Sequence, residues 1–114
     1  MNLNNNFDYS VLMSVYKNDK DIYIKNAIES MINQTVMPKQ YVVVVDGPVG
    51  MEIEKTITKY EQEYSDMFTI IRLKENRGLG NALNIGMKEC RYELIARMDA
   101  DDISLPQRCE MQLE

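Results

Sequence analysis

The sequence has no histidine and no tryptophan, and it has only two cysteines among 114 residues. Without histidine, neither a Ser-His-Asp triad nor a Cys-His pair nor a histidine metal site can form. Cys90 and Cys109 lack Cys-x-x-Cys spacing and have no histidine to join them, so neither a zinc site nor a disulfide framework is indicated. Any catalysis or metal binding therefore falls to carboxylates.

Long apolar runs and basic clusters are also missing. The longest strongly apolar run, Tyr41 to Val45, is far shorter than the roughly 20 residues that span a bilayer, and the N-terminus lacks a signal-peptide core. The formal net charge is −5 and no cluster of Lys and Arg is present, so no nucleic-acid partner is expected. Together with the sparse cysteines, these absences predict a soluble, cytoplasmic protein.

The composition is that of one folded domain. Hydrophobic residues make up 45% of the chain and charged residues 27%, which is ordinary for a globular protein. Residues 1–8 are polar and rich in Asn, and we expect a flexible arm there. Residues 9–114 are then expected to form a single α/β domain, because this length allows one core.

Strand and helix patterns alternate along the domain. Short apolar runs predict strands at residues 10–16, 41–46, 68–73 and 92–98. Helical spacing of apolar residues predicts a helix capped by Asp19 or Asp21 and ending near residue 34, a second at 51–64, and a third from after residue 78 to about 90. The residues expected to face inward from the third helix are Leu79, Ala82, Leu83 and Met87. The alternation predicts an α/β fold with a mostly parallel sheet and helices on both faces.

Polar and turn residues follow every predicted strand. In an open parallel sheet the carboxyl ends of the strands share one edge, and ligands bind beyond that edge. The four segments that follow the strands are residues 16–18, 46–48, 75–78 and 99–102. We therefore expect the functional site where these segments meet.

The last segment is strongly acidic. Asp99, Asp101 and Asp102 place three carboxylates around Ala100, and they would repel one another if packed together without a cation. Magnesium and manganese use one or two protein carboxylates and complete their shell with water and phosphate oxygens, so Asp99-Ala100-Asp101 suits a diphosphate ligand. The alternative is an acidic loop that caps a helix ahead of Pro106.

Asp46 directly follows four valines, at the mouth of the clearest predicted strand. Its carboxylate could accept hydrogen bonds from a nucleobase or ribose. Alternatively, it could bond its own backbone in the turn before Gly47 and Pro48. Position alone does not decide between these two roles.

Arg77 precedes Gly78-Leu79-Gly80 at the start of the third predicted helix. These glycines match the dinucleotide-binding fingerprint only in part, because Leu83 stands where the third glycine belongs. We expect a tight turn that points Arg77 into the site. The alternative is an ordinary surface arginine.

Four motifs occur in one order along residues 9–112: Ser10-Val-Leu-Met-Ser-Val-Tyr, Val-Val-Val-Asp46-Gly-Pro, Asn76-Arg-Gly-Leu-Gly-Asn-Ala-Leu-Asn-Ile-Gly, and Ala96-Arg-Met-Asp-Ala-Asp-Asp-Ile-Ser-Leu-Pro. In this order and spacing the chain resembles family 2 glycosyltransferases, especially bacterial enzymes of capsule and exopolysaccharide synthesis. The resemblance implies a GT-A fold, of which this chain is the Rossmann-like nucleotide-binding half. It also implies inverting transfer of a sugar from a nucleoside diphosphate, often UDP, to a saccharide or lipid-linked acceptor, with the full-length protein at the inner face of the membrane.

The same resemblance gives roles to individual residues. Ser14, Val15 and Tyr16 would line the base pocket, Asp46 would bind the base, and Arg77 would contact the nucleotide. Asp99 would face the ribose and the metal, Asp101 would coordinate Mg²⁺ or Mn²⁺ on the diphosphate, and Asp102 would support them.

Two features depart from the family pattern. Gly47-Pro48 follows Asp46 where many members have Asp-Asp-Gly-Ser, so base recognition is expected to differ. The chain also stops at Glu114, before the acceptor site and the catalytic base of such enzymes, and we expect a truncated domain that is inactive alone.

Two other functions stay open at this point. A sugar-phosphate nucleotidyltransferase would need a glycine-rich, basic loop near the first strand, which Lys17-Asn18-Asp19-Lys20 does not provide. A non-enzymatic receiver-like domain also clusters aspartates at strand ends, but here no aspartate ends the third strand.

Overall fold

The computed structural model describes residues 8–34 and 36–100. Apart from Asp8, the expected N-terminal arm lies outside the described residues, and so do Asp101, Asp102 and Cys109. The elements in chain order are β1 (Tyr9–Val15), α1 (Asp21–Ile32), β2 (Gln40–Val45), α2 (Met51–Glu63), β3 (Phe68–Arg72), α3 (Leu79–Glu89) and β4 (Leu94–Asp99). Every predicted strand and helix is present, with ends shifted by only a few residues.

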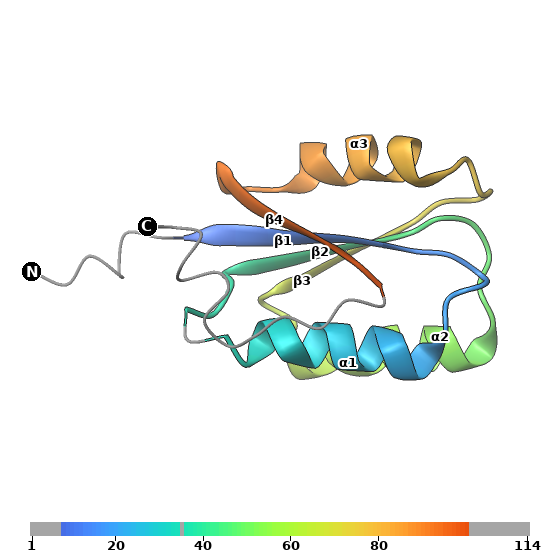
Figure 1. The fold of residues 1–114 in the computed structure, drawn as a ribbon, viewed down its shortest axis with the longest axis horizontal. Helices are drawn as coiled ribbons and strands as arrows, with labels where there is room; N and C mark the ends of the chain where they lie inside the picture. Colours follow the sequence, from blue (N-terminus) through green and yellow to red (C-terminus); the bar gives the residue numbers. More distant parts are fainter. Residues whose placement is uncertain (1–7, 35, 101–114) are drawn as a thin grey trace, which may run out of the picture.

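The strands form one parallel sheet in the order β3-β2-β1-β4. Helices α1 and α2 cover one face of this sheet and α3 covers the other (Figure 1). The predicted fold class is therefore confirmed. Because all four strands run in the same direction, their carboxyl ends lie at one edge of the sheet.

The two faces of the sheet are packed differently. The larger core lies under α1 and α2, where strand residues such as Val11 and Met13 pack with Ile24, Ile28 and Ile57. The smaller core lies under α3 and contains Leu12, Val42, Val44 and Ala82 as its buried members. Every residue of β2 is buried, as its run of valines predicts.

Small residues hold α3 close to the sheet. The prediction that Leu79 and Met87 face inward is wrong, since they are 56% and 48% exposed, whereas Ala82 and Gly86 are buried. A Cβ atom at Gly86 would lie 2.3 Å from Leu12 Cδ1 and 2.8 Å from Val44 Cγ2, so only glycine permits this approach. Leu79 is the first residue of α3 and belongs to neither core, but it lines a cleft together with Asp99 and Ala100.

A buried glutamine links the other end of α3 to the sheet. Gln40 Nε2 donates hydrogen bonds to the Glu89 carbonyl at 2.9 Å and to Thr69 Oγ1 at 3.1 Å. Gln40 Oε1 accepts from Ser10 Oγ at 2.7 Å and from the Arg91 backbone N–H at 2.8 Å. These four bonds satisfy the amide fully and join three strands to the end of α3.

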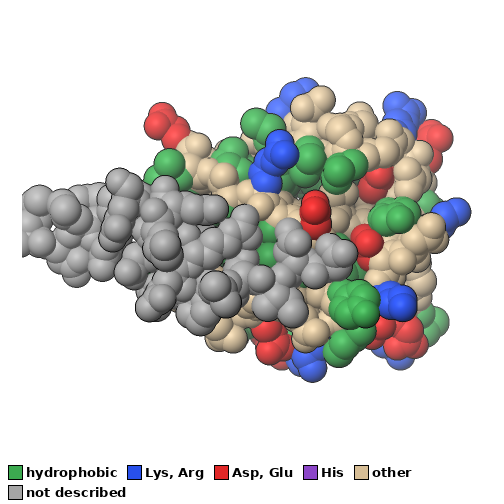
Figure 2. Space-filling view, viewed as in Figure 1, with side chains coloured by type: hydrophobic (Ala, Val, Ile, Leu, Met, Phe, Trp, Pro, Cys, Tyr) green, Lys and Arg blue, Asp and Glu red, His purple; other side chains and the backbone are tan. Residues whose placement is uncertain are grey.

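Among the described residues that Figure 2 colours, Lys and Arg side chains are scattered among Asp and Glu side chains and form no large patch of one sign. Within the described residues, no helix combines the length and apolar character needed to cross a membrane.

We predict that Gly86→Ala lowers the free energy of unfolding. Overpacking typically costs roughly 1–3 kcal/mol, which exceeds the gain of up to about 1 kcal/mol from replacing glycine with alanine in a helix. Gly80→Ala is the control in the same helix, because nothing lies within 4 Å of its added Cβ. Urea unfolding followed by circular dichroism gives the free energy of unfolding of both variants. Equal stability of the two variants would contradict the close approach of α3.

Candidate nucleotide site

A cleft of about 430 Å³ opens at the carboxyl edge of the sheet. Its walls come from the ends of β1, β2 and β4 and from the loop that precedes α3. The lining residues are Ser14, Tyr16, Asp19, Asp46, Asn76, Gly78, Leu79, Asp99 and Ala100. The sheet register accounts for part of this gathering, since Ser14 of β1 pairs directly with Asp99 of β4. The cleft lies at the edge where the sequence predicted a site.

The segment after β1 is held in a turn by Asp19. The Tyr16 backbone N–H donates to Asp19 Oδ2 at 2.9 Å, and the Asp19 N–H donates to the Tyr16 carbonyl at 3.1 Å. Asp19 therefore does not cap α1, whose N-cap is Lys20 and has no side-chain hydrogen bond. Tyr16 remains 40% exposed and lines the cleft.

Asp46 is almost completely buried, with 3% of its surface exposed. Its Oδ1 accepts a hydrogen bond from the Arg77 backbone N–H at 3.0 Å, and its Oδ2 accepts one from the Gly78 N–H at 3.1 Å. These donors belong to the loop between β3 and α3, so Asp46 does not use its carboxylate for its own turn. Sequence reasoning foresaw its place at the strand end but not these partners.

The residue after Asp46 contacts the same loop. Gly47 has a φ of +89°, and a Cβ atom there would lie 2.5 Å from the Asn76 backbone nitrogen. Both the left-handed conformation and the short distance require glycine at this position. The β2 end and the β3–α3 loop thus form one continuous wall of the cleft.

Asp99 ends β4 with an exposed side chain that lines the cleft. Among the described residues, no group of three potential metal ligands occurs. The predicted partners Asp101 and Asp102 lie outside the described residues, so the acidic motif is described only at Asp99 and Ala100. An exposed carboxylate at a cleft wall is an oxygen donor of the kind that Mg²⁺ and Mn²⁺ prefer.

Two of the predicted site residues lie apart from the cleft. The Val15 side chain is completely buried in the core beneath α1 and α2. The Arg77 side chain is 66% exposed and forms an ion pair with Glu75 at 3.3 Å, at a neighbouring surface hollow. The expectation that Arg77 points into the site is therefore not met in this structure.

The cleft includes residues that sequence reasoning did not select. Asp19 and Leu79 line it although neither was expected there, and Asn76, which lies in the expected segment 75–78, was given no individual role. Asp19 and Asn76 each lie within a few residues of a strand end, which was the available signal. Leu79 was assigned to the core because helical periodicity does not show which neighbours a residue at the start of a helix meets.

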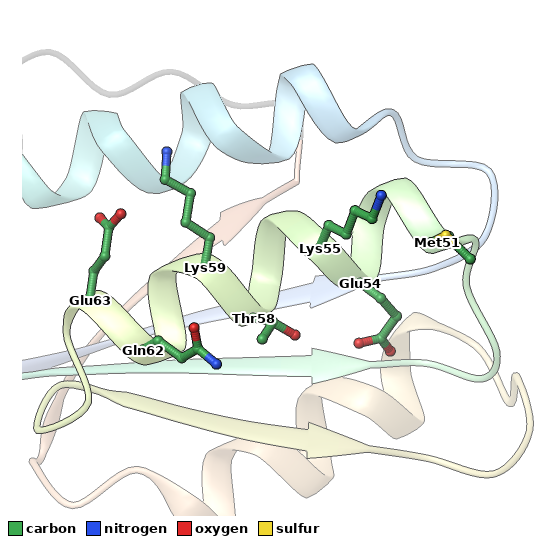
Figure 3. A pocket seen from close by; sticks show the side chains of 7 residues that line it. All are labelled: Met51, Glu54, Lys55, Thr58, Lys59, Gln62 and Glu63. Carbon is green, nitrogen blue, oxygen red and sulfur yellow. The ribbon is translucent and has the colours of Figure 1, made fainter.

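A larger hollow, of about 510 Å³, lies on the outer side of α2. Figure 3 shows its seven lining side chains, among them Met51, Lys55 and Glu63, and all of them belong to this one helix. Because no second element faces them, the hollow is a shallow surface rather than a binding cleft. We therefore place the site at the sheet edge.

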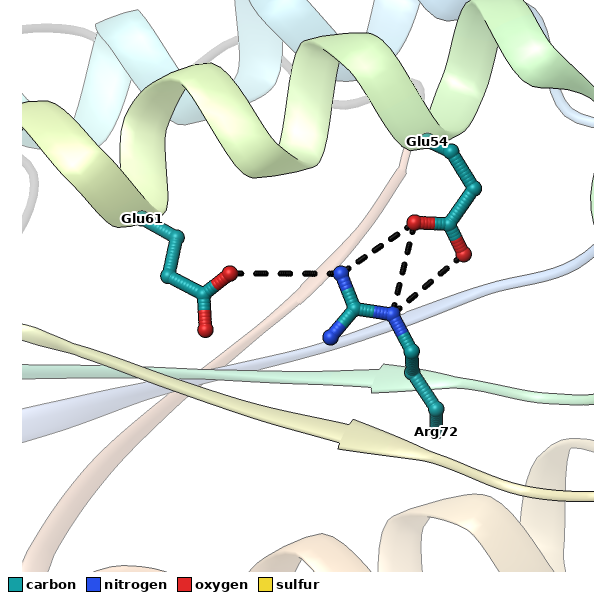
Figure 4. A network of polar contacts seen from close by, with 3 residues as sticks. All are labelled: Glu54, Glu61 and Arg72. Carbon is teal, nitrogen blue, oxygen red and sulfur yellow. Dashed lines mark hydrogen bonds and ion pairs between the residues drawn. The ribbon is translucent and has the colours of Figure 1, made fainter.

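Glu54, which lines this hollow, also joins α2 to the sheet. Arg72 of β3 forms ion pairs with Glu54 at 3.1 Å and with Glu61 at 3.9 Å (Figure 4). The three side chains are about 40% exposed, and pairs exposed to this degree add little to stability. This network links an edge strand to α2 and has no contact with the cleft.

Comparison with known proteins assigns the chain to a family. The model for glycosyl transferase family 2 matches residues 10–114. The chain belongs to this family. The resemblance seen in the four motifs is thereby confirmed, and the nucleotidyltransferase and receiver-like alternatives are set aside.

Two curated relatives illustrate the match. The chain is 38% identical over 105 residues to the amylovoran biosynthesis glycosyltransferase AmsE of Erwinia amylovora, covering 92% of this chain and 39% of the relative. It is 33% identical over 106 residues to the UDP-Gal:alpha-D-GlcNAc-diphosphoundecaprenol beta-1,3-galactosyltransferase of Escherichia coli, covering 93% of this chain and 38% of that relative. The chain thus spans less than two fifths of the length of these relatives.

Solved structures share the fold. S. aureus TarS 1–349 in complex with UDP superimposes with a TM-score of 0.78 at 22% identity, covering 94% of this chain and 31% of that one. The mannosyltransferase PcManGT from Pyrobaculum calidifontis, in complex with GDP-Man and Mn²⁺, gives a TM-score of 0.72 at 20% identity over 83% of this chain and 28% of that one. The fold is therefore the GT-A fold expected from the motifs.

We predict that Gly78→Ala destabilises the loop that borders the cleft. Gly78 is the N-cap of α3, with φ +97° and ψ +164°, a region that residues other than glycine enter at a cost of roughly 1–3 kcal/mol. Gly50→Ala is the matched control, because Gly50 is the N-cap of α2 with an ordinary φ of −71° and open space around it. Chemical unfolding compares the two, and an equal loss of stability in both variants would contradict the backbone strain.

Proposed function

We propose that the cleft at the sheet edge binds a nucleoside diphosphate sugar, with a UDP-sugar as the donor. The observation that carries this proposal is the gathering of Ser14, Tyr16, Asp46 and Asp99 around one cleft in a chain of glycosyl transferase family 2. Relatives and neighbours support it, because the names of several include UDP-Gal, UDP or UDP-GlcNAc.

The geometry suggests how a nucleotide would lie. The partly exposed Tyr16 would offer a stacking surface for the base. Ser14 is paired with Asp99 on the neighbouring strand, and Asp99 would face the ribose. Val15 would contribute backbone only, since its side chain is buried. Arg77 would reach the nucleotide after leaving Glu75, a small cost for an exposed ion pair.

The charge of the cleft calls for a cation. Among the described residues that line it, Asp19, Asp46 and Asp99 are acidic and none is basic. A diphosphate entering such a cleft would be repelled unless a cation neutralised it. Asp99 and Asp101 would hold Mg²⁺ or Mn²⁺, with Asp102 in support, and the bound ion would offset the charge on the departing diphosphate.

For the whole protein we propose inverting transfer of the sugar to a saccharide or lipid-linked saccharide in polysaccharide synthesis. The proposed place is the cytoplasm, at the inner face of the membrane for a lipid-linked acceptor. Relatives named for amylovoran biosynthesis and for a diphosphoundecaprenol substrate support this class of reaction. Because those relatives are much longer than this chain, we propose that the acceptor site and the catalytic base lie beyond residue 114 and that residues 1–114 bind the donor without transferring it.

The test is thermal stability with Mn²⁺, with UDP, and with both. At a UDP concentration about 100 times its Kd, binding to the folded state adds about 2.7 kcal/mol of stability. We expect this gain only when metal and UDP are both present, and we expect Asp99→Ala and Asp101→Ala to abolish it.

Asp66→Ala is the matched control, because Asp66 is an exposed acid just before β3, at the opposite end of the strands. It should keep the full response to UDP and Mn²⁺. If saturating UDP with Mn²⁺ fails to stabilise the unmodified chain, the donor-site proposal is wrong.

A further inference from the structure

We propose that Asp19 is a positioning residue, which acts on the nucleotide by holding Tyr16 in place at the wall of the cleft. This inference rests on the proposed function and assigns a further residue to it. Asp19 binds both the backbone N–H and the carbonyl of Tyr16, and Tyr16 is an aromatic residue that lines the cleft.

The first reason is how the chain continues after β1. The Val15 carbonyl, at the end of this strand, still accepts the Asp46 backbone N–H at 2.7 Å. One residue later, the Tyr16 N–H donates to Asp19 Oδ2 at 2.9 Å, and the Tyr16 carbonyl accepts the Asp19 N–H at 3.1 Å. Asp19 therefore takes the place of a neighbouring strand as the partner of the Tyr16 backbone.

The second reason is the start of α1. Aspartate next to a helix start ordinarily accepts the free N–H groups of the first turn, which stabilises the helix. Asp19 directly precedes Lys20, the N-cap of α1, yet this helix begins without a side-chain hydrogen bond at its cap. The carboxylate accepts the Tyr16 N–H instead. A departure from the local rule at the wall of a cleft is typical of a contact kept for function.

The third reason is the charge of the cleft. Asp19 is half-buried and lines the cleft together with Asp46 and Asp99, so its carboxylate would repel a diphosphate that it touched directly. A hydrogen bond to the Tyr16 backbone helps binding without such a contact, because a side chain that is already ordered loses less conformational entropy when the ligand binds. The role that fits the contacts of Asp19 is thus an indirect one.

Three variants separate positioning from direct contact with the ligand or its metal ion. Asp19→Ala removes the oxygen that accepts the Tyr16 N–H. Asp19→Asn keeps an oxygen that can accept this N–H and removes the negative charge. Tyr16→Ala removes the ring through which Asp19 would act. Asp21→Ala is the matched control, because Asp21 is an acid in the first turn of α1 and is not among the residues that line the cleft.

Calorimetry with UDP and Mn²⁺, on the full chain, measures nucleotide affinity. We expect Asp19→Ala to weaken UDP binding about tenfold, because the ligand must then order Tyr16 as it binds. We expect Asp19→Asn and Asp21→Ala to bind UDP within about twofold of the unmodified chain, since both keep an acceptor for the Tyr16 N–H. In a chain that already carries Tyr16→Ala, adding Asp19→Ala should cause no further loss of affinity.

Backbone amide exchange tests the turn without any ligand. We expect Asp19→Ala to accelerate exchange at the Tyr16 amide at least about fivefold, and Asp19→Asn to keep it near the rate of the unmodified chain. The Asp46 amide is the internal reference, because it donates to the Val15 carbonyl and not to Asp19. Its protection should be the same in every variant.

An equal loss of UDP affinity in Asp19→Asn and Asp19→Ala would overturn the inference, because the charge itself would then serve the nucleotide or the metal ion. So would a further loss when Asp19→Ala is added to Tyr16→Ala, or unchanged affinity in Asp19→Ala. If the unmodified chain does not bind UDP with Mn²⁺, the proposed function fails, while exchange at the Tyr16 amide still decides whether Asp19 holds the turn.

Discussion

The structure depends on the register of its parallel sheet. Four strands that run in one direction bring their carboxyl ends to one edge of the sheet. Because Ser14 pairs with Asp99, the ends of β1 and β4 lie side by side at that edge. Residues from distant parts of the chain thereby share one cleft. A shift of one residue between β1 and β2 would turn their buried residues toward the other face of the sheet, so the packing of the two central strands protects their register. The site follows from the same packing that stabilises the fold.

Helix α3 is held to the sheet both by apolar packing and by polar contacts. It approaches the sheet through Ala82 and Gly86, which bury little apolar surface compared with the layer beneath α1 and α2. Buried polar side chains compensate at both ends, with Asp46 at its start and Gln40 at its finish. The start of α3 borders the cleft, so a contact that stabilises the helix also shapes the proposed nucleotide site.

The sequence predicted the elements and the edge at which they meet. The valines before Asp46 identify a strand buried on both faces, and the aspartate after them marks its end. Sequence periodicity could not show that Leu79 lines the cleft or that Arg77 turns toward Glu75, because both depend on which segments of the chain lie next to them. It also could not pair Asp46 with the Arg77 and Gly78 backbone, since that contact joins segments far apart in the chain. Of the predicted acidic motif, only Asp99 and Ala100 lie within the described residues.

The most direct test of the central claim is to map UDP on the chain by backbone amide chemical shifts, titrating UDP in the presence of Mg²⁺. The account predicts shifts at Ser14, Tyr16, Asn76 and Asp99, with the outer side of α2 unchanged. Shifts concentrated on α2 around Thr58 and Gln62, or none at saturating UDP, would contradict a nucleotide site at the edge of the sheet.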